Sequence, residues 1–328
     1  MRVVLFYRKR HEGNFSIENL FKQICQAFPK EVAWETKELS FYSKGLLRRY
    51  LIGMEAMLNQ RGINHITGDI NFIAIFLRKR HTILTIHDVG YMKNRNPIAR
   101  LILLWFWIRW PVRRSSIIAV VSHATKDELL KYVWIHPAKI KVIHVPFSPL
   151  FESTPKEFNK KEPVILQVGT KLNKNLTRLI HALKDIPCKL EIIGNLTDSI
   201  VKELKENKIN YQSSANLTEQ EIVMKYKTSD IVSFVSTYEG FGIPILEGNS
   251  VGRVVVTSNT LSMPEVAGDS AHLVDPFDVD SIRCGFLKVI DDDIYREELI
   301  RIGFINKDRF KVEKIAQQYV EIYKSFDE

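Results

Sequence analysis

The chain has 328 residues, of which 45% are hydrophobic and 26% are charged. This ordinary composition excludes a disordered or fibrous protein, and the length predicts about two domains. The three cysteines, Cys25, Cys188 and Cys284, are far apart and odd in number. They lack the spacing of metal ligands and favour a reducing compartment.

Positive charge is concentrated in the first half of the chain. Residues 1–150 carry 24 Lys/Arg and 10 Asp/Glu, a net charge of +14, whereas residues 151–328 carry 23 and 28, a net charge of −5. A basic half predicts an anionic partner, which is nucleic acid, a membrane surface or a phosphorylated substrate. A solvated charged surface is the simpler alternative.

Short apolar runs alternate with helical patterns along the whole chain. The N-terminal run is too short for a signal peptide and predicts a buried strand instead. Continuous runs, such as those at 82–86 and 163–168, are typical of strands buried on both faces of a parallel sheet. The alternation predicts an α/β fold. The predicted strands are 2–7, 32–36, 63–67, 82–86, 116–121, 140–145, 163–168, 188–194, 208–212, 230–235, 253–257 and 270–274.

An irregular segment at 146–163 divides the predicted strands into two series. It contains four prolines and the charge changes sign there, which indicates a linker. We therefore predict two doubly wound, Rossmann-like domains, one at 1–149 and one at 150–310. Open α/β sheets bind ligands at the carboxyl ends of their strands, so a cleft between two facing domains is the expected site.

Two loops of the first domain are candidates for ligand contact. Gly13 lies between the first strand and the first helix, where its backbone can approach a phosphate; the alternative is a turn in which Ser16 caps the helix. His87 follows the strand at 82–86. It either hydrogen-bonds a substrate or binds a loop carbonyl.

Two stretches of the basic half have the character of membrane-interface segments. Residues 44–58 predict an amphipathic helix, which lies either at the interface or in the core. Residues 98–110 are too short and too charged to span a bilayer, which needs ~20 apolar residues; they form either a buried crossover helix or an interfacial segment. The predicted membrane or acceptor side consists of Lys44, Arg48, Arg49, Trp105 and Trp107, beside an apolar face of Leu47, Tyr50, Leu51, Met54 and Leu58.

A lysine-containing turn follows the first strand of the second domain. It reads Gly169-Thr-Lys-Leu-Asn-Lys-Asn175 and opens a helix. Lys171 and Lys174 are placed to bind a diphosphate at a helix N-terminus, although exposed lysines of an ordinary turn are the alternative. The turn lacks the Gly-Lys-Ser/Thr of a Walker A loop and the further glycines of a dinucleotide fingerprint.

No metal site is expected. Asp291-Asp-Asp293 ends a helical run without a nearby histidine and predicts a solvated helix end. No His/Cys/Asp cluster has the spacing of zinc ligands, and no Gly-x-Ser-x-Gly elbow is present.

The most informative motif lies at 236–247. It reads Ser-Thr-Tyr-Glu-Gly-Phe-Gly-Ile-Pro-Ile-Leu-Glu between a strand-like run and a helical pattern. A glycine-rich turn before a helix exposes backbone N–H groups that bind anions, and glycine allows close approach of a ligand. Glu239 and Glu247 add acceptors for hydroxyl groups. The motif predicts a phosphate and sugar hydroxyls bound side by side, as in a nucleotide-sugar.

These features resemble glycosyltransferase family 4, the retaining sugar-nucleotide transferases with the GT-B fold, over nearly the whole chain. The most specific match is the Glu–seven residues–Glu signature from Glu239 to Glu247. Further matches are Gly169 with Lys174 and Asn175, Thr85-Ile-His-Asp88, Val121-Ser-His-Ala-Thr125, Pro264-Glu-Val-Ala-Gly268 and Leu273-Val-Asp-Pro276.

The resemblance implies roles for individual residues. Glu239 would bind donor-sugar hydroxyls, Glu247 the ribose, and Lys174 the diphosphate leaving group; His87 would lie near the reacting carbon. A C-terminal helix at about 311–328 would pack back on the first domain. The implied catalytic residues are His87, Glu239 and Lys174, and the implied donor-binding residues are Gly13, Lys171, Lys174, Asn175, Gly194, Glu239, Gly240, Phe241, Gly242, Ile243 and Glu247.

The chain departs from the family pattern at two places. Asn173 stands where the family usually has an arginine, and we expect Lys171 to replace that cation. The family's N-terminal glycine-rich loop is reduced to Gly13.

The expected function is a metal-independent, retaining transfer of a hexose, such as mannose, from a nucleoside-diphosphate-sugar to a lipid-linked or cell-surface glycan. No cofactor is expected. The protein would be cytoplasmic and bound to the inner face of the cell membrane, with an anionic membrane surface but no nucleic acid as partner. The alternatives are a GT-B epimerase or phosphorylase, which lack this signature, and a non-enzymatic protein that binds membranes or nucleic acid through its basic surface.

Overall fold

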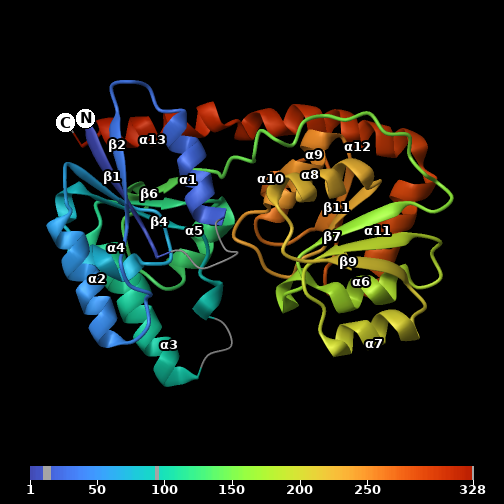
Figure 1. Cartoon of the computed structure of the whole chain (residues 1–328), viewed down its shortest axis with the longest axis horizontal. Coiled ribbons are helices and arrows are strands. Elements are labelled where there is room, and N and C mark those ends of the chain that lie inside the picture. Colours follow the sequence, from blue (N-terminus) through green and yellow to red (C-terminus); the bar gives the residue numbers. More distant parts are fainter. Residues whose placement is uncertain (10–15, 93–95, 327–328) are drawn as a thin grey trace. The chain divides into compact units, whose positions relative to one another are not determined.

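The computed structural model describes residues 1–9, 16–92 and 96–326. The chain forms two compact units (Figure 1). Unit 1 comprises Met1–Pro146 and Lys311–Glu328, and unit 2 comprises Phe147–Phe310. The C-terminal segment therefore belongs to the same unit as the N-terminus.

Unit 1 is built on a parallel sheet. Its six described strands have the order β2-β1-β3-β4-β5-β6, so the direction of winding reverses between β1 and β3. Both faces are covered by helices, which is why the central strands are apolar along their length. The strands are β1 (Arg2–Tyr7), β2 (Ala33–Glu38), β3 (Ile63–Ile66), β4 (Thr82–Ile86), β5 (Ile117–Val120) and β6 (Ile140–Val142).

The helices of unit 1 fill the connections between these strands. The α-helices are α1 (Ser16–Gln26), α2 (Leu46–Leu58), α3 (Pro97–Leu103), α4 (Trp110–Arg114), α5 (His123–Leu130) and α13 (Val312–Lys324). The short 3₁₀ segments are η1 (Asn71–Ile75), η2 (Lys79–His81), η3 (Gly90–Met92) and η5 (Pro137–Lys139), and the π-helical segment is η4 (Leu104–Arg109).

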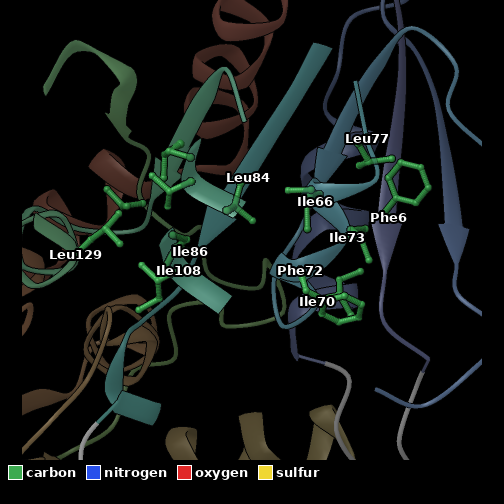
Figure 2. Packing of buried hydrophobic residues seen from close by; sticks show 14 of the residues in the cluster. Phe6, Ile66, Ile70, Phe72, Ile73, Leu77, Leu84, Ile86, Ile108 and Leu129 are labelled. Carbon is green, nitrogen blue, oxygen red and sulfur yellow. The ribbon is translucent and has the colours of Figure 1, made fainter. Parts of the chain in front are cut away.

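Two hydrophobic clusters lie on opposite faces of this sheet. Val4 and Phe6 of β1 belong to the first cluster, which includes Ile52 of α2 and Ile108 of η4. Phe6 and Ile108 are labelled in Figure 2. The neighbouring β1 residues belong to the second cluster, with side chains of α1 and α13. Alternate side chains of a strand point to opposite faces, so the helices on each side of the sheet pack on apolar side chains.

Buried side-chain hydrogen bonds link α13 to the sheet. The ring of His65 on β3 is hydrogen-bonded through Nδ1 to the hydroxyl of Tyr323, at 2.7 Å, and through Nε2 to Oγ1 of Thr85, at 2.8 Å. Burial lowers the pKa of His65 to about 3, so the ring stays neutral. Because both ring nitrogens have partners, the histidine is accommodated in the core without an unsatisfied polar group.

Unit 2 has a second parallel sheet. Its six described strands have the order β12-β11-β10-β7-β8-β9, and the winding reverses between β7 and β10. Leu179 of α6 and Phe286 of α11 pack in its main cluster. The strands are β7 (Val164–Val168), β8 (Lys189–Ile193), β9 (Asn210–Ser214), β10 (Ile231–Phe234), β11 (Val254–Ser258) and β12 (His272–Val274).

The helices of unit 2 follow each strand in turn. They are α6 (Leu176–Leu183), α7 (Asp198–Glu206), α8 (Glu219–Thr228), α9 (Ile243–Val251), α10 (Met263–Ala267), α11 (Val279–Asp291) and α12 (Asp293–Asn306), with the 3₁₀ segments η6 (Leu172–Lys174) and η7 (Lys307–Phe310). The two sheets confirm the predicted two-domain Rossmann-like α/β fold.

Each predicted strand is present, with small shifts at the ends. β9 begins two residues later than expected, because Lys208 takes a positive φ of 54° after α7. The strand expected from residue 270 begins at His272, because Ser270 still donates to the carbonyl of Ala267.

The two segments with interfacial character are partly buried. In α3 and η4, Ile108 is buried, so the crossover-helix interpretation is correct there, whereas Ile98 is 75% exposed. In α2 the core side is formed by Ile52 and Ala56. The predicted apolar face of α2 points away from the core, and Leu47 is 73% exposed. Among the described residues, no helix combines the length and apolarity needed to cross a membrane.

Candidate active site

The strongest site candidate lies where the winding of unit 2 reverses. Open α/β sheets bind ligands at such a point, beyond the carboxyl ends of the strands. The loop after β7 and the loop after β10 meet there: the backbone N–H of Thr237 donates to the carbonyl of Asn173, at 2.8 Å. Residues that are about 65 positions apart in the chain thus become neighbours.

Lys174 and Glu239 form the polar centre of this site. Nζ of Lys174 is 2.8 Å from Oε1 of Glu239, and both side chains are less than one-fifth exposed. The ammonium also lies 4.7 Å from the centre of the Phe234 ring. Gly169, with φ of +90°, makes room for the lysine stem, since a Cβ there would lie 3.1 Å from two of its carbons. The cation and the carboxylate are therefore held together and remain accessible to a ligand.

Asn173 orients the carboxylate. Its Nδ2 donates to Oε1 of Glu239, at 3.1 Å, and to the carbonyl of Tyr238, at 3.0 Å. Lys171 is exposed, and in the part of the chain that the structure describes its side chain has no ion-pair or hydrogen-bond partner. The replacement of the missing arginine by Lys171 stays a prediction.

Asn175 joins the loops around the site. Its Nδ2 donates to the carbonyls of Val235 and Pro276, at 2.9 and 2.6 Å, and its Oδ1 accepts from Arg178. Both amide hydrogens are thus used inside the protein. Asn175 holds the turn that presents Lys174, a positioning role that the sequence alone did not reveal.

Two glycines with positive φ lie in the loops of this site. Gly194, with φ of +139°, follows β8 and lies next to Thr170, where a Cβ would lie 2.9 Å from a side-chain carbon. Gly242, with φ of +136°, precedes α9, and no side chain caps this helix. Its first turn begins with Ile243 and carries no acidic residue, so the N-terminus of α9 is suited to an anion. The side chain of Phe241 is buried against Phe310.

Glu247 lies on α9, and the hydroxyl of Tyr226 donates to its Oε2. Burial raises the pKa of Glu247 to about 7, although the Tyr226 hydrogen bond and the charge of Lys174 act in the opposite direction. Tyr226 is fully buried on α8. No local pattern distinguished it in the sequence, because a tyrosine on the inner side of a helix is ordinarily a core residue.

The raised pKa of Glu247 predicts a pH-dependent stability. The folded protein holds this proton more tightly than the unfolded chain, whose carboxyl titrates near 4.5. The stabilisation is complete below pH 4.5 and is lost as the pH rises through about 7. We expect Glu247→Gln to be more stable than the wild type above that range, with a difference that shrinks toward pH 4.5. Thermal unfolding across the range measures this, and a pH-independent difference contradicts it.

His87 belongs to unit 1, at the end of β4. Its Nε2–H donates to the carbonyl of Thr67, at 2.7 Å, so Nδ1 carries the lone pair of the neutral ring. Burial lowers its pKa. The histidine therefore does bind a loop carbonyl, and its second nitrogen is an acceptor suited to a substrate hydroxyl. Gly13, the other loop candidate in this unit, lies outside the described residues.

The residues predicted for the acceptor side separate into two groups. Lys44, Arg48, Arg49 and Trp107 line one pocket of unit 1. Trp105 does not line it, and instead its ring lies 5.0 Å from the guanidinium of Arg109.

No metal centre is found among the described residues, where no group of three or more His, Cys, Asp or Glu side chains is placed to hold an ion. Asp292 caps α12 and pairs with Lys288, and Asp293 pairs with Arg296. The aspartate run thus acts as a helix boundary.

Comparison with known proteins defines the class. The model of glycosyl transferases group 1 matches residues 151–304, and that of glycosyltransferase family 4 matches residues 46–148. The chain belongs to these glycosyltransferases, with the GT-B fold.

Two curated relatives are each 25% identical to this chain. An O-antigen chain mannosyltransferase B of Escherichia coli is 25% identical over 75% of this chain and 71% of that protein. An MMP alpha-(1->4)-mannosyltransferase of Mycolicibacterium hassiacum is 25% identical to this chain. The match covers 64% of this chain and 54% of that protein.

Among solved structures, HepE of Anabaena, in complex with UDP and glucose, has a TM-score of 0.79 at 15% identity and covers 99% of this chain and 100% of its own. A sucrose-phosphate synthase of Thermosynechococcus elongatus has a TM-score of 0.81 at 14% identity, over 99% and 98% of the two chains.

Proposed function

We propose that this glycosyltransferase moves a hexose, such as mannose, from a nucleoside-diphosphate-sugar to a lipid-linked or cell-surface polysaccharide. The observation that carries the proposal is the Lys174–Glu239 pair beside the open N-terminus of α9, at the point where the winding of unit 2 reverses. It offers a cation and backbone N–H groups to a diphosphate and a carboxylate to sugar hydroxyls. The mannosyltransferase names of the relatives support the choice of hexose.

The proposed reaction is a substitution at the anomeric carbon. The bond from this carbon to the diphosphate oxygen breaks, and the oxygen keeps the electron pair. Lys174 and the N-terminus of α9 stabilise the charge that develops there. The acceptor hydroxyl forms its bond on the same face of the sugar, which retains the configuration, and its proton passes to the departing phosphate. Glu239 faces the oxocarbenium-like sugar and balances its charge.

Metal independence is part of the proposal, because Lys174 and helix N–H groups supply the positive charge that a metal ion would otherwise provide. A turnover screen over nucleotide-sugars, including GDP-mannose and UDP-glucose, tests the function. We expect acceptor-dependent release of nucleoside diphosphate that EDTA does not reduce. Conversion of the donor to an epimer, or no turnover of any donor, would contradict the transferase proposal.

We also propose that the protein binds the inner face of the cell membrane through α2. The support is an exposed apolar face beside cations: Leu58 is 77% exposed, and Arg48 and Arg49 occupy the same helix. Basic helices with such a face lie in the membrane interface.

The membrane proposal predicts the effect of removing two leucines. We expect Leu47→Gln with Leu51→Gln to lower co-sedimentation with phosphatidylglycerol vesicles by at least ~10-fold, since each buried leucine contributes about 1.5–3 kcal/mol. The matched control is Ile294→Gln with Ile305→Gln, two exposed side chains of unit 2. Equal vesicle binding by all three proteins would refute the assignment.

A further inference from the structure

A pocket lies in unit 1, where the winding of its sheet reverses between β1 and β3. It has a volume of about 660 Å³, within the range of roughly 300–1,000 Å³ that small-molecule sites have. Its lining residues come from the segments after β1, β2, β3 and β4 and from α2, α3 and η4. This is the position where an open α/β sheet binds its ligand, but no residue of the Lys174–Glu239 site takes part.

The charged groups of this pocket are mostly positive. They are Arg8, Lys9, Lys44, Arg48, Arg49 and the single carboxylate of Asp69. That carboxylate is already paired with Arg8, as is Glu18. In the part of the chain that the structure describes, the side chains of Lys44 and Arg48 have no ion-pair partner. The pocket therefore has an excess of positive charge.

The position of the arginines makes this excess unfavourable in the free protein. Arg48 and Arg49 lie near the start of α2, whose first turn contains no acidic residue and whose N-cap, Gly45, offers no side chain. Cations are destabilising at this end of a helix dipole. Aromatic contacts hold two of the cations in place: the guanidinium of Arg49 lies 4.8 Å from the Trp107 ring, and Nζ of Lys9 lies 4.9 Å from the Tyr42 ring. A bound anion would relieve the repulsion.

Apolar side chains line the pocket and are exposed on two of the helices that contribute to it. Leu103 and Phe41 line it, and Leu47 and Leu51 are exposed on the same helix as Arg48. On α3, Leu101 is 56% exposed. Residues three or four positions apart share a helix face, so α2 presents cations to the pocket and an apolar strip beside it. A ligand that matches both has an anionic head joined to an apolar chain.

We propose that this pocket binds the diphosphate of a lipid-linked acceptor, a sugar joined through diphosphate to a long apolar chain. The inference rests on the proposed transferase function and narrows its acceptor. Lys44 and Arg48 bind the phosphate oxygens, Arg49 is held toward them by Trp107, and the chain leaves along the leucines of α2.

Equilibrium binding of farnesyl diphosphate to the full-length protein tests the inference, with farnesol as the probe that lacks phosphate. We expect farnesyl diphosphate to bind at least ten-fold more tightly than farnesol. Lys44→Gln with Arg48→Gln should remove most of this difference without lowering the melting temperature, since among the described residues neither side chain has an ion-pair or hydrogen-bond partner to lose. The matched control, Arg61→Gln with Arg80→Gln, removes the same charge from exposed positions outside the pocket and should bind as the wild type does.

Results of three kinds would overturn the inference. The first is equal affinity for farnesyl diphosphate and farnesol, or equal affinity of the pocket variant and the control. The second is competition of farnesyl diphosphate with UDP or GDP, which would assign the pocket to the donor. The third is loss of binding to phosphatidylglycerol vesicles at unchanged farnesyl diphosphate affinity, which would assign the cations to membrane lipid headgroups. The turnover screen over nucleotide-sugars tests the transferase proposal separately.

Discussion

Replacing Glu239 by glutamine is expected to lower the rate of sugar transfer by roughly 10²–10³-fold, the effect of removing one preorganised electrostatic contact from an active site. The carboxylate lies 2.8 Å from Lys174 and 3.1 Å from Nδ2 of Asn173, so its position is set before a donor arrives. Glutamine keeps the shape and removes the charge that balances the oxocarbenium-like sugar. Steady-state release of nucleoside diphosphate in the presence of acceptor measures the loss.

The control for this variant is Glu297→Gln, which changes an exposed glutamate on α12. Both variants should keep the melting temperature close to that of the wild type, because glutamine fills the same space and its side-chain oxygen can still accept from Asn173. Transfer by Glu239→Gln within a few-fold of the wild-type rate would remove Glu239 from the catalytic machinery. It would leave the fold assignment untouched.

Replacing Lys174 by methionine should lower kcat by about 10²–10³-fold, with a smaller change in KM. The ammonium opposes charge that grows on the leaving diphosphate in the transition state, so most of its effect is on the rate and not on donor binding. Methionine keeps the packing of the stem against Gly169 and removes the ammonium that lies over the Phe234 ring. The control is Lys205→Met, on the exposed side of α7.

The double variant Lys174→Met with Glu239→Gln separates a joint role from two independent ones. Residues in contact couple, so their effects should not add. A loss in the double variant equal to the product of the two single losses would show that the pair does not act as one unit. A higher KM at unchanged kcat in the Lys174→Met variant would mean that Lys174 contributes equally to the binding of the ground state and of the transition state.

The sequence identified most elements of the fold and part of the site. Continuous apolar runs predicted the strands, because a strand buried on both faces needs apolar side chains at every position. Gly169 and Glu239 were found because each follows such a run, where the chain turns toward a helix. For residues 98–110 the sequence allowed two interpretations, a buried crossover helix and an interfacial segment. Apart from two arginines, the side chains of this stretch are almost all apolar, so periodicity does not tell the buried Ile108 from the exposed Ile98.

Partners from distant segments were not predictable. The sequence showed Asn173 only as the residue that replaces the family's usual arginine, but its amide donates to the carboxylate of Glu239. Tyr226 was not singled out by any sequence motif, but it donates to Glu247. In both cases the contact depends on which strands lie next to each other, and strand order is not written in any local pattern.

Local chemistry was therefore determined by the sequence alone: two parallel α/β units, a basic first half, and a motif suited to a phosphate and hydroxyls. Propensity, turn chemistry and charge act over a few residues, so they can be read along the chain. The tertiary structure decided that β10 pairs with β7, which brings Glu239 to Lys174, and that the segments after β1 and β3 enclose one cationic pocket in unit 1. Crossover connections set this order, because each helix must return to a free edge of the sheet and cover its apolar face.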